Sequence, residues 1–244
     1  MGWLAGIRKQ SATATAAAVA PEPPPPNERH AAPGLVQAFA RLEGRPRRIL
    51  DLGPPLHANL TRYARLAPRL AIGDLTGALE DGLSPIAAID EAFSGLRLGG
   101  PSEPFELVLA WDLPNHLGRE ALPRLAAILA PRCSQGCHFY ALLEAGKTMP
   151  ALPRRYRIRE EELEQECSTG EEIPSPRLMP GELDRVLPGF VVDKSRLLAH
   201  GVQEVLMQRT DHAEVPITRQ APLRRELRKT LPRGRQSMPP RRRP

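Results

Sequence analysis

The sequence predicts an α/β fold with a doubly wound, mostly parallel sheet. Short apolar runs of strand length alternate with segments whose apolar residues have helical spacing, and such alternation is typical of parallel sheets. Two further strand-like runs meet around His200 and Gly201 and predict a closing antiparallel hairpin. The predicted strands lie at 47–53, 69–75, 105–111 and 137–145, and the hairpin spans 190–209.

The first half of the predicted domain alternates between helix and strand. Apolar residues at helical spacing predict a helix in 34–42, and the strand 47–53 ends at Gly53. A helix over 60–68 precedes the strand 69–75, with Pro68 just after the helical pattern. A helix follows Ser84, a good N-cap, because Pro85 suits a first helical turn.

The second half begins with the most apolar strand, 105–111. A helix over 119–131 follows, and Asn115 is a candidate N-cap for it. After the strand 137–145 the chain is polar and interrupted by prolines, and we predict a short acidic helix in 159–166. A last helix begins at Pro180, before the closing hairpin.

Composition divides the chain into three parts. The 28 prolines concentrate near both ends, and Pro-rich polar segments cannot bury enough apolar surface to fold. We therefore predict a disordered Ala/Pro-rich segment over 1–33, one folded domain over 34–215 and a disordered basic tail over 216–244.

The net charge of +6 belongs to the tail and not to the predicted domain. Residues 216–244 hold ten Lys or Arg against one Glu, a balance of +9, which leaves −3 for the rest. The charge therefore does not indicate a nucleic-acid enzyme. Three kinds of partner are compatible with the tail: a polyanion such as RNA, an anionic membrane, or another protein. Its basic residues suit the first two, and a narrow helical stripe of Leu223, Leu227 and Leu231 lies among them. A merely solvated tail is the alternative.

Cysteine usage and hydropathy indicate a cytoplasmic protein. Three cysteines are too few for a disulfide framework, and neither a secretory signal nor an apolar run of membrane length is evident. Cys133, Cys137 and His138 invite a metal site. The spacing of the cysteines is unusual for structural zinc, and strand alternation would point Cys137 and His138 to opposite faces, so no metal is predicted.

Polar side chains gather where the predicted parallel strands end. Asp51 and Gly53 close the strand "ILDLG", Asp74 closes "AIGDL", and Trp111 and Asp112 close "FELVLAWD". Ligands of doubly wound sheets bind beyond the carboxyl ends of the strands, so these residues are the candidate binding site.

These motifs, in this order, resemble the class I S-adenosylmethionine-dependent methyltransferases over about residues 34–210. The resemblance implies a Rossmann-like fold that ends in an antiparallel hairpin, as in the seven-stranded sheet of that family. It also implies S-adenosylmethionine as cofactor and a methyl acceptor that the sequence does not name. Asp51, Gly53 and Asp74 would then hold the cofactor, with Trp111 and Asp112 at its methyl end.

The turn after Asp51 departs from the family pattern. Where the family has acid-x-Gly-x-Gly-x-Gly, this chain has "DLGPPLHAN", with Pro55 and His57 at the later glycine positions. Proline has no N–H and a fixed φ, so the turn offers a cofactor fewer donors and more bulk. We therefore expect weak cofactor binding or none.

Two hypotheses about function follow. In the first, the chain is an active methyltransferase, and His116 beyond Asp112 is the candidate catalytic base because histidine often serves as a base near neutral pH. In the second, the chain is an inactive relative that kept the fold as a binding or scaffold protein. His116 at the start of a helix is also compatible with a purely structural role.

Overall fold

The computed structural model describes residues 27–42, 47–66, 69–96, 103–166, 170–198 and 201–210. The basic tail and residues 1–26 lie outside these ranges, so the disorder predicted for both ends stays a prediction. In the described part, no helix has the length and apolar character needed to cross a membrane.

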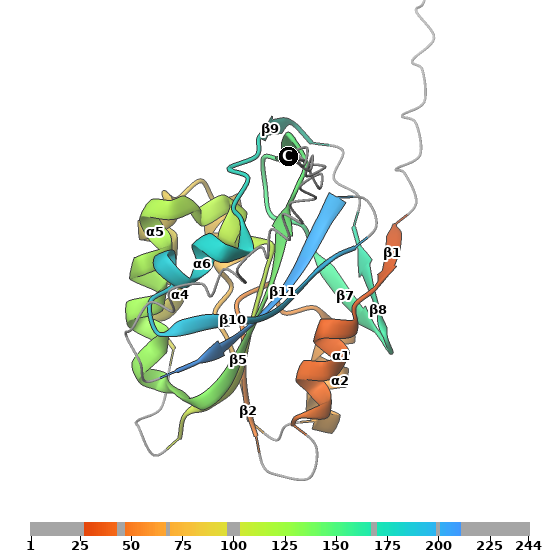
Figure 1. Cartoon of the computed structure of the whole chain (residues 1–244), viewed down its shortest axis with the longest axis vertical. Helices are drawn as coiled ribbons and strands as arrows, with labels where there is room; N and C mark the ends of the chain where they lie inside the picture. The colour runs from red at the N-terminus through yellow and green to blue at the C-terminus, as the bar shows by residue number, and fades with distance from the viewer. Residues whose placement is uncertain are drawn as a thin grey trace, which may run out of the picture. The chain divides into compact units, whose positions relative to one another are not determined.

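A six-stranded sheet forms the centre of the fold, in the order β10-β11-β5-β4-β2-β3 (Figure 1). β5, β4, β2 and β3 run parallel, and β11 and β10 are antiparallel to their neighbours. This arrangement confirms the predicted fold class, including the closing hairpin. The strands are β2 (Arg48–Asp51), β3 (Arg69–Ile72), β4 (Phe105–Trp111), β5 (Cys133–Glu144), β10 (Phe190–Leu197) and β11 (Val202–Arg209).

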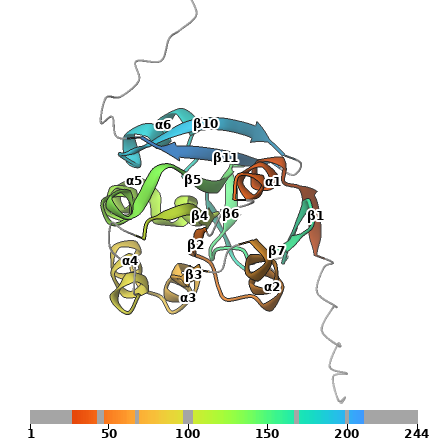
Figure 2. The same ribbon diagram turned by 90° about the horizontal axis from the view of Figure 1, so that it is seen from below.

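Helices cover both faces of this sheet (Figure 2). One apolar cluster joins it to α3, α4, α5 and α6, and a second joins it to α1 and α2. β4 contributes side chains to both clusters, because successive residues of a strand point to opposite faces of the sheet. Leu107 and Leu109 belong to the second cluster, and Val108 and Ala110 belong to the first. The helices are α1 (Pro33–Ala40), α2 (His57–Leu66), α3 (Leu75–Glu80), α4 (Pro85–Ser94), α5 (Leu113–Leu129) and α6 (Pro180–Val186), and a 3-10 turn, η1 (Ala130–Arg132), follows α5.

The prediction of an acidic helix in 159–166 is wrong, because most of this segment belongs to a β-hairpin. β7 (Tyr156–Arg159) pairs antiparallel with β8 (Glu162–Gln165). Side chains alternate along β7, with Tyr156 and Ile158 buried, and Glu160 has the left-handed φ of 43° that a tight turn uses. Burial on one face thus outweighs the helix propensity of the glutamates.

The N-terminal boundary also needs correction. Residues 28–31, placed by composition in the disordered segment 1–33, form β1 (Glu28–Ala31) on the edge of β8. The Arg29 guanidinium pairs with Glu164 at 3.1 Å, and Asn27 donates to the same carboxylate at 2.9 Å. Long-range pairing of this kind is invisible to local composition.

Helix α5 begins earlier than the predicted residue 119. Gly118 has φ 66° and ψ 177°, so α5 consists of a first turn and a longer second part that begins where the sequence predicted the helix. Asn115 lies inside the first turn and does not cap it, since Asp112 occupies the N-cap position. The remaining small sheet pairs β6 (Thr148–Pro150) with β9 (Glu172–Pro174).

Candidate functional site

Asp51 lies at the carboxyl end of β2 and is fully engaged by neighbours. Its Oδ1 accepts from the Gly53 amide at 2.9 Å and from the Trp111 indole N–H at 2.6 Å. Its Oδ2 accepts from the Tyr63 hydroxyl at 2.6 Å. Burial raises the pKa of the Asp51 carboxyl, although the hydrogen bonds from Tyr63, Trp111 and Gly53 act in the opposite direction.

Trp111 occupies the space directly beside Gly53. A Cβ on Gly53 would lie 2.7 Å from the Trp111 Nε1, so the indole and the turn are in close contact. The ring also stacks on Tyr156, with centroids 5.6 Å apart and planes at 12°. Trp111 itself has a φ of 50°, a strained conformation for a non-glycine residue, which places its ring over the turn.

Between Leu52 and Leu56, the turn after Asp51 presents no free backbone donor. The Leu52 amide donates to the Leu109 carbonyl, and the Gly53 amide to Asp51. Pro54 and Pro55 have no N–H, and the Leu56 amide donates to the Pro54 carbonyl. From Leu52 to Leu56, the turn therefore lacks the N–H groups that a carboxylate or ribose would need.

Asp74 lies at the end of β3, as expected, and caps α3. Its Oδ1 accepts from the Gly77 amide at 2.8 Å. Its side chain makes no other hydrogen bond to a described residue. Asp74 is thus the cofactor candidate with most remaining capacity to bind a ligand.

Asp112 belongs to a buried charge cluster with Arg154 and Glu144. Arg154 donates its backbone N–H to Asp112 Oδ2 at 3.0 Å and its guanidinium to Glu144 Oε2 at 2.9 Å. Burial acts to lower the pKa of Arg154, but Tyr156, Asp112 and Glu144 raise it above its usual range, so it stays charged. Two carboxylates share one guanidinium here, and Asp112 Oδ1 is buried without a partner among the described residues.

The segment between β5 and β8 covers the carboxyl ends of the strands. Arg154 and Tyr156 of this segment reach Asp112 and Trp111, and Arg155 pairs with Glu80 of α3 at 2.7 Å. Asn59 of α2 holds it on the other side, since its amide donates to the Tyr156 carbonyl at 2.8 Å and accepts from the Ile158 amide at 2.9 Å. This segment therefore contacts Trp111 and Asp112 directly, two of the residues that the sequence placed in the candidate site.

His116 lies one helical turn beyond Asp112. Its Nε2 is 3.8 Å from Asp112 Oδ2, which is too long for a hydrogen bond. The His116 side chain is only 5% exposed and lines a cavity of about 350 Å³ together with mostly apolar residues. This cavity touches neither Asp51 nor Gly53.

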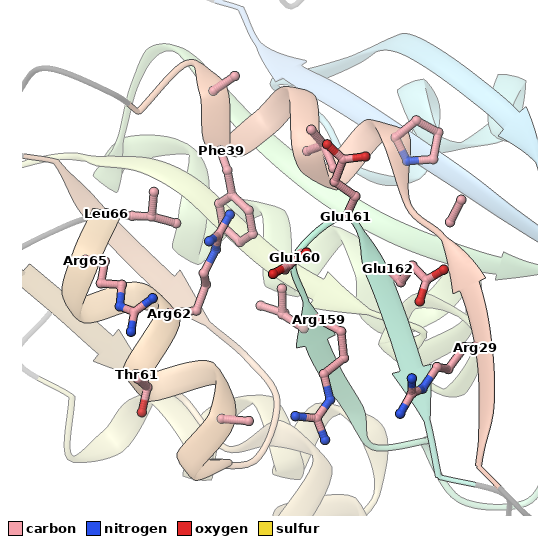
Figure 3. A pocket seen from close by; sticks show the side chains of 16 residues that line it. Arg29, Phe39, Thr61, Arg62, Arg65, Leu66, Arg159, Glu160, Glu161 and Glu162 are labelled. Atoms are coloured by element: carbon pink, nitrogen blue, oxygen red, sulfur yellow. The ribbon is translucent and has the colours of Figure 1, made fainter.

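A larger groove of about 1170 Å³ lies between α1, α2 and the β7–β8 turn (Figure 3). Phe39 and Ile158 contribute to its apolar lining. Arg62 and Arg65 project from α2, and Glu160 to Glu162 stand on the β7–β8 turn. None of these five charged side chains forms an ion pair within the described ranges.

Cys133, Cys137 and His138 do not come together as metal ligands. Both cysteines are buried free thiols, Cys137 packs in the cluster with α5, and His138 contacts Arg41, just after α1, on the other face. Among the described residues, no group of three or more His, Cys, Asp or Glu side chains could hold a metal ion.

Asp51, Gly53 and Trp111 contact one another in the structure, together with partners that the sequence did not indicate. Tyr63, which donates to Asp51, lies in the helix predicted over 60–68, where no local pattern marks it as a partner of that carboxylate. Arg154 and Tyr156 lie in the polar, proline-interrupted segment after 137–145, for which the sequence predicted only a short acidic helix. The alternation of Tyr156 and Ile158 was the available signal.

Neither a protein-family model nor a curated protein matches the chain. Solved structures similar to it include the 1,6-didemethyltoxoflavin-N1-methyltransferase of Burkholderia thailandensis, at 20% identity over 73% of this chain and 77% of that one, with a TM-score of 0.42. Others are S-adenosylmethionine-dependent methyltransferases from Methanosarcina mazei and Clostridium acetobutylicum. The first is 11% identical over 72% of this chain and 96% of that chain, with a TM-score of 0.38. The second is 10% identical over 72% and 89%, with a TM-score of 0.39.

Proposed function

We propose that this chain is a binding or scaffold protein that keeps a methyltransferase-like fold without using S-adenosylmethionine. The carrying observation is the position of Trp111, whose indole lies against Gly53 and donates to Asp51. A cofactor at this turn would have to displace a buried ring and break a hydrogen bond to a buried carboxylate. Such a bond to a charged group contributes about 1.5–3 kcal/mol.

The other residues that could contact a cofactor here would not compensate for this loss. The turn has no free N–H from Leu52 to Leu56, and Asp74 already caps α3 through one oxygen. The residues present therefore do not fit S-adenosylmethionine in this conformation.

Calorimetric titration of the full chain with S-adenosylmethionine and S-adenosylhomocysteine tests the proposal. We expect no heat of binding at ligand concentrations up to about 1 mM. A dissociation constant of that size corresponds to a binding free energy of about −4 kcal/mol. Micromolar binding that is lost in Asp74→Ala would contradict the proposal and favour an active methyltransferase. Micromolar binding that survives both Asp74→Ala and Gly53→Val would contradict the assignment of the site.

The active enzyme is the second candidate, and the cavity beside His116 favours it. His116 would accept a proton from the methyl acceptor, with Asp112 next to the ring. Methyl transfer from S-adenosylmethionine to a small hydroxylated acceptor, lost in His116→Gln, would establish it.

The groove of Figure 3 is the surface that we assign to a peptide partner. Its apolar lining is flanked by Arg62 and Arg65 on one side and by Glu160 to Glu162 on the other, where Arg29 and Arg159 are paired with Glu164. It is therefore complementary to a segment with an apolar centre and separated acidic and basic residues. Peptides selected from a random display library on the full chain should share that pattern and lose binding to an Arg62→Glu, Arg65→Glu variant. Selected peptides that bind this variant equally well would contradict the assignment.

The basic tail is assigned to polyanion contact. Its charge balance of +9, against −3 elsewhere, motivates this. Deletion of 216–244 should abolish salt-sensitive retention on heparin or RNA. Unchanged retention would show that the contact lies elsewhere.

A further inference from the structure

The cavity beside His116 lies between α3, the first turn of α5 and the β6–β9 pair. Its volume of about 350 Å³ is at the lower end of the range for small-molecule sites. The lining is almost entirely apolar and includes Leu79, Met149 and Ile173. Prolines on two of the lining segments restrict the backbone, so the cavity is largely preformed.

His116 supplies the available polar group of this cavity. Its side chain is 95% buried, since only 5% is exposed, yet it forms no hydrogen bond to any described residue. The neighbouring Asn115 also lines the cavity, but its side chain already bonds the Asp112 and Leu142 carbonyls and the Glu144 amide. The imidazole therefore keeps hydrogen-bonding capacity that a ligand in the cavity would use.

The charges around His116 indicate which ligand it would accept. Asp112 Oδ2 lies 3.8 Å from Nε2 and favours the tautomer with hydrogen on that nitrogen. The other ring nitrogen then keeps its lone pair and accepts a hydrogen bond. Asp112 and Glu144 outnumber Arg154 at this place, so a carboxylate ligand would meet a negative environment.

We infer that this cavity binds a small apolar molecule bearing one hydroxyl group, of the phenol class, whose O–H donates to His116. The site goes beyond the proposed loss of cofactor binding and does not depend on it, because Asp51, Gly53 and Asp74 do not line the cavity.

Two exposed apolar residues agree with this assignment. Leu83 is 38% exposed and Leu152 is 47% exposed, and both line the cavity. They are among the few large apolar residues of the described part that face solvent to this extent. A bound ring would cover them.

Ligand-observed NMR and calorimetry on the full chain test the inference with 4-methylphenol, toluene and benzoate as probes. We expect 4-methylphenol to bind about three- to tenfold more tightly than toluene, because one neutral hydrogen bond contributes about 0.5–1.5 kcal/mol. Benzoate should bind more weakly than either. Absence of 4-methylphenol binding at millimolar concentration would overturn the inference.

Variants separate the hydrogen bond from the cavity. His116→Leu should make toluene and 4-methylphenol bind equally, while His116→Gln, which keeps an acceptor, should retain part of the difference. Leu83→Ala, at an exposed position, should weaken both probes without unfolding the chain. Arg124→Ala, at an exposed position outside both cavities, is the control and should leave the binding of both probes unchanged. An unchanged preference in His116→Leu, or displacement of 4-methylphenol by adenosine, would overturn the assignment.

Discussion

Trp111 donates its indole N–H to Asp51 across 2.6 Å, although the two residues lie 60 positions apart in the sequence. The bond joins the carboxyl ends of the neighbouring strands β2 and β4. It places an aromatic ring where a doubly wound sheet usually admits a ligand. The two residues that suggest a cofactor site in the sequence therefore bond to each other in the structure.

Removing the indole N–H should destabilise the fold. In Trp111→Phe the buried Asp51 Oδ1 loses one of its two donors, and we expect the free energy of unfolding to fall by about 1–3 kcal/mol. Tyr63→Phe removes the donor to Oδ2 and should cost a similar amount. Urea denaturation measures both, and two unchanged midpoints would show that Asp51 does not depend on these bonds.

Asn59 should hold the β5–β8 segment in place. Asn59→Ala leaves a backbone carbonyl and a backbone amide of β7 without partners, at a cost of about 2–4 kcal/mol. Limited proteolysis should then cut within 146–166 more rapidly. Thr61→Ala, two residues along α2 at an exposed position, is the control and should change stability by less than about 0.5 kcal/mol.

Arg154 and Arg155, although adjacent, should differ sharply in their contribution to the free energy of unfolding. Arg154→Met leaves Asp112 and Glu144 as buried carboxylates without a counter-charge, and we expect a loss of about 3–5 kcal/mol. Arg155→Met breaks a partly exposed pair with Glu80 and should cost about 0–1 kcal/mol. Equal thermal unfolding of the two variants would contradict the buried cluster.

His138 should make stability depend on pH. Burial, and then the Arg41 guanidinium, lower its pKa from 6.5 to about 4, against a smaller opposing effect of Asp193. Between these values the unfolded chain binds more protons, so stability falls as pH falls from 6.5 to 4. We expect a loss of about 1–2 kcal/mol, after allowance for partial solvation.

His138→Gln provides the comparison for this pH range, since glutamine still accepts from Arg41 but does not titrate. Urea midpoints of this variant should vary less between pH 6.5 and 4 than those of the parent. The hydrogen bonds from Arg159 and Asn27 lower the pKa of Glu164 to about 2. The contribution of Glu164 to stability is therefore lost at lower pH, from 4.5 downward. A parent protein with constant stability from pH 6.5 to 4 would contradict the assignment.

Apolar runs predicted β2 and β4 because burial on both faces leaves a strong local signal, as in 105–111, whereas β10 of the predicted hairpin is mostly exposed. Asp51, Asp74 and Asp112 were placed correctly at strand ends for the same reason. Their partners were not predictable, since Tyr63 and Arg154 reach them through tertiary packing that no local pattern encodes. The β7–β8 hairpin was missed because its four glutamates imitate a helix, while only alternating burial distinguishes it as β-structure.

β10 forms one edge of the central sheet, and its exposed backbone is a template on which a second molecule could add a strand. The register with β11 shifts at Asp193, which bulges from the strand, and Lys194 and Arg196 beside it are exposed. A bulge and like charges at an edge oppose intermolecular pairing. The chain should therefore resist edge-to-edge aggregation at high concentration, and Lys194→Val with Arg196→Val should make it precipitate without altering the fold.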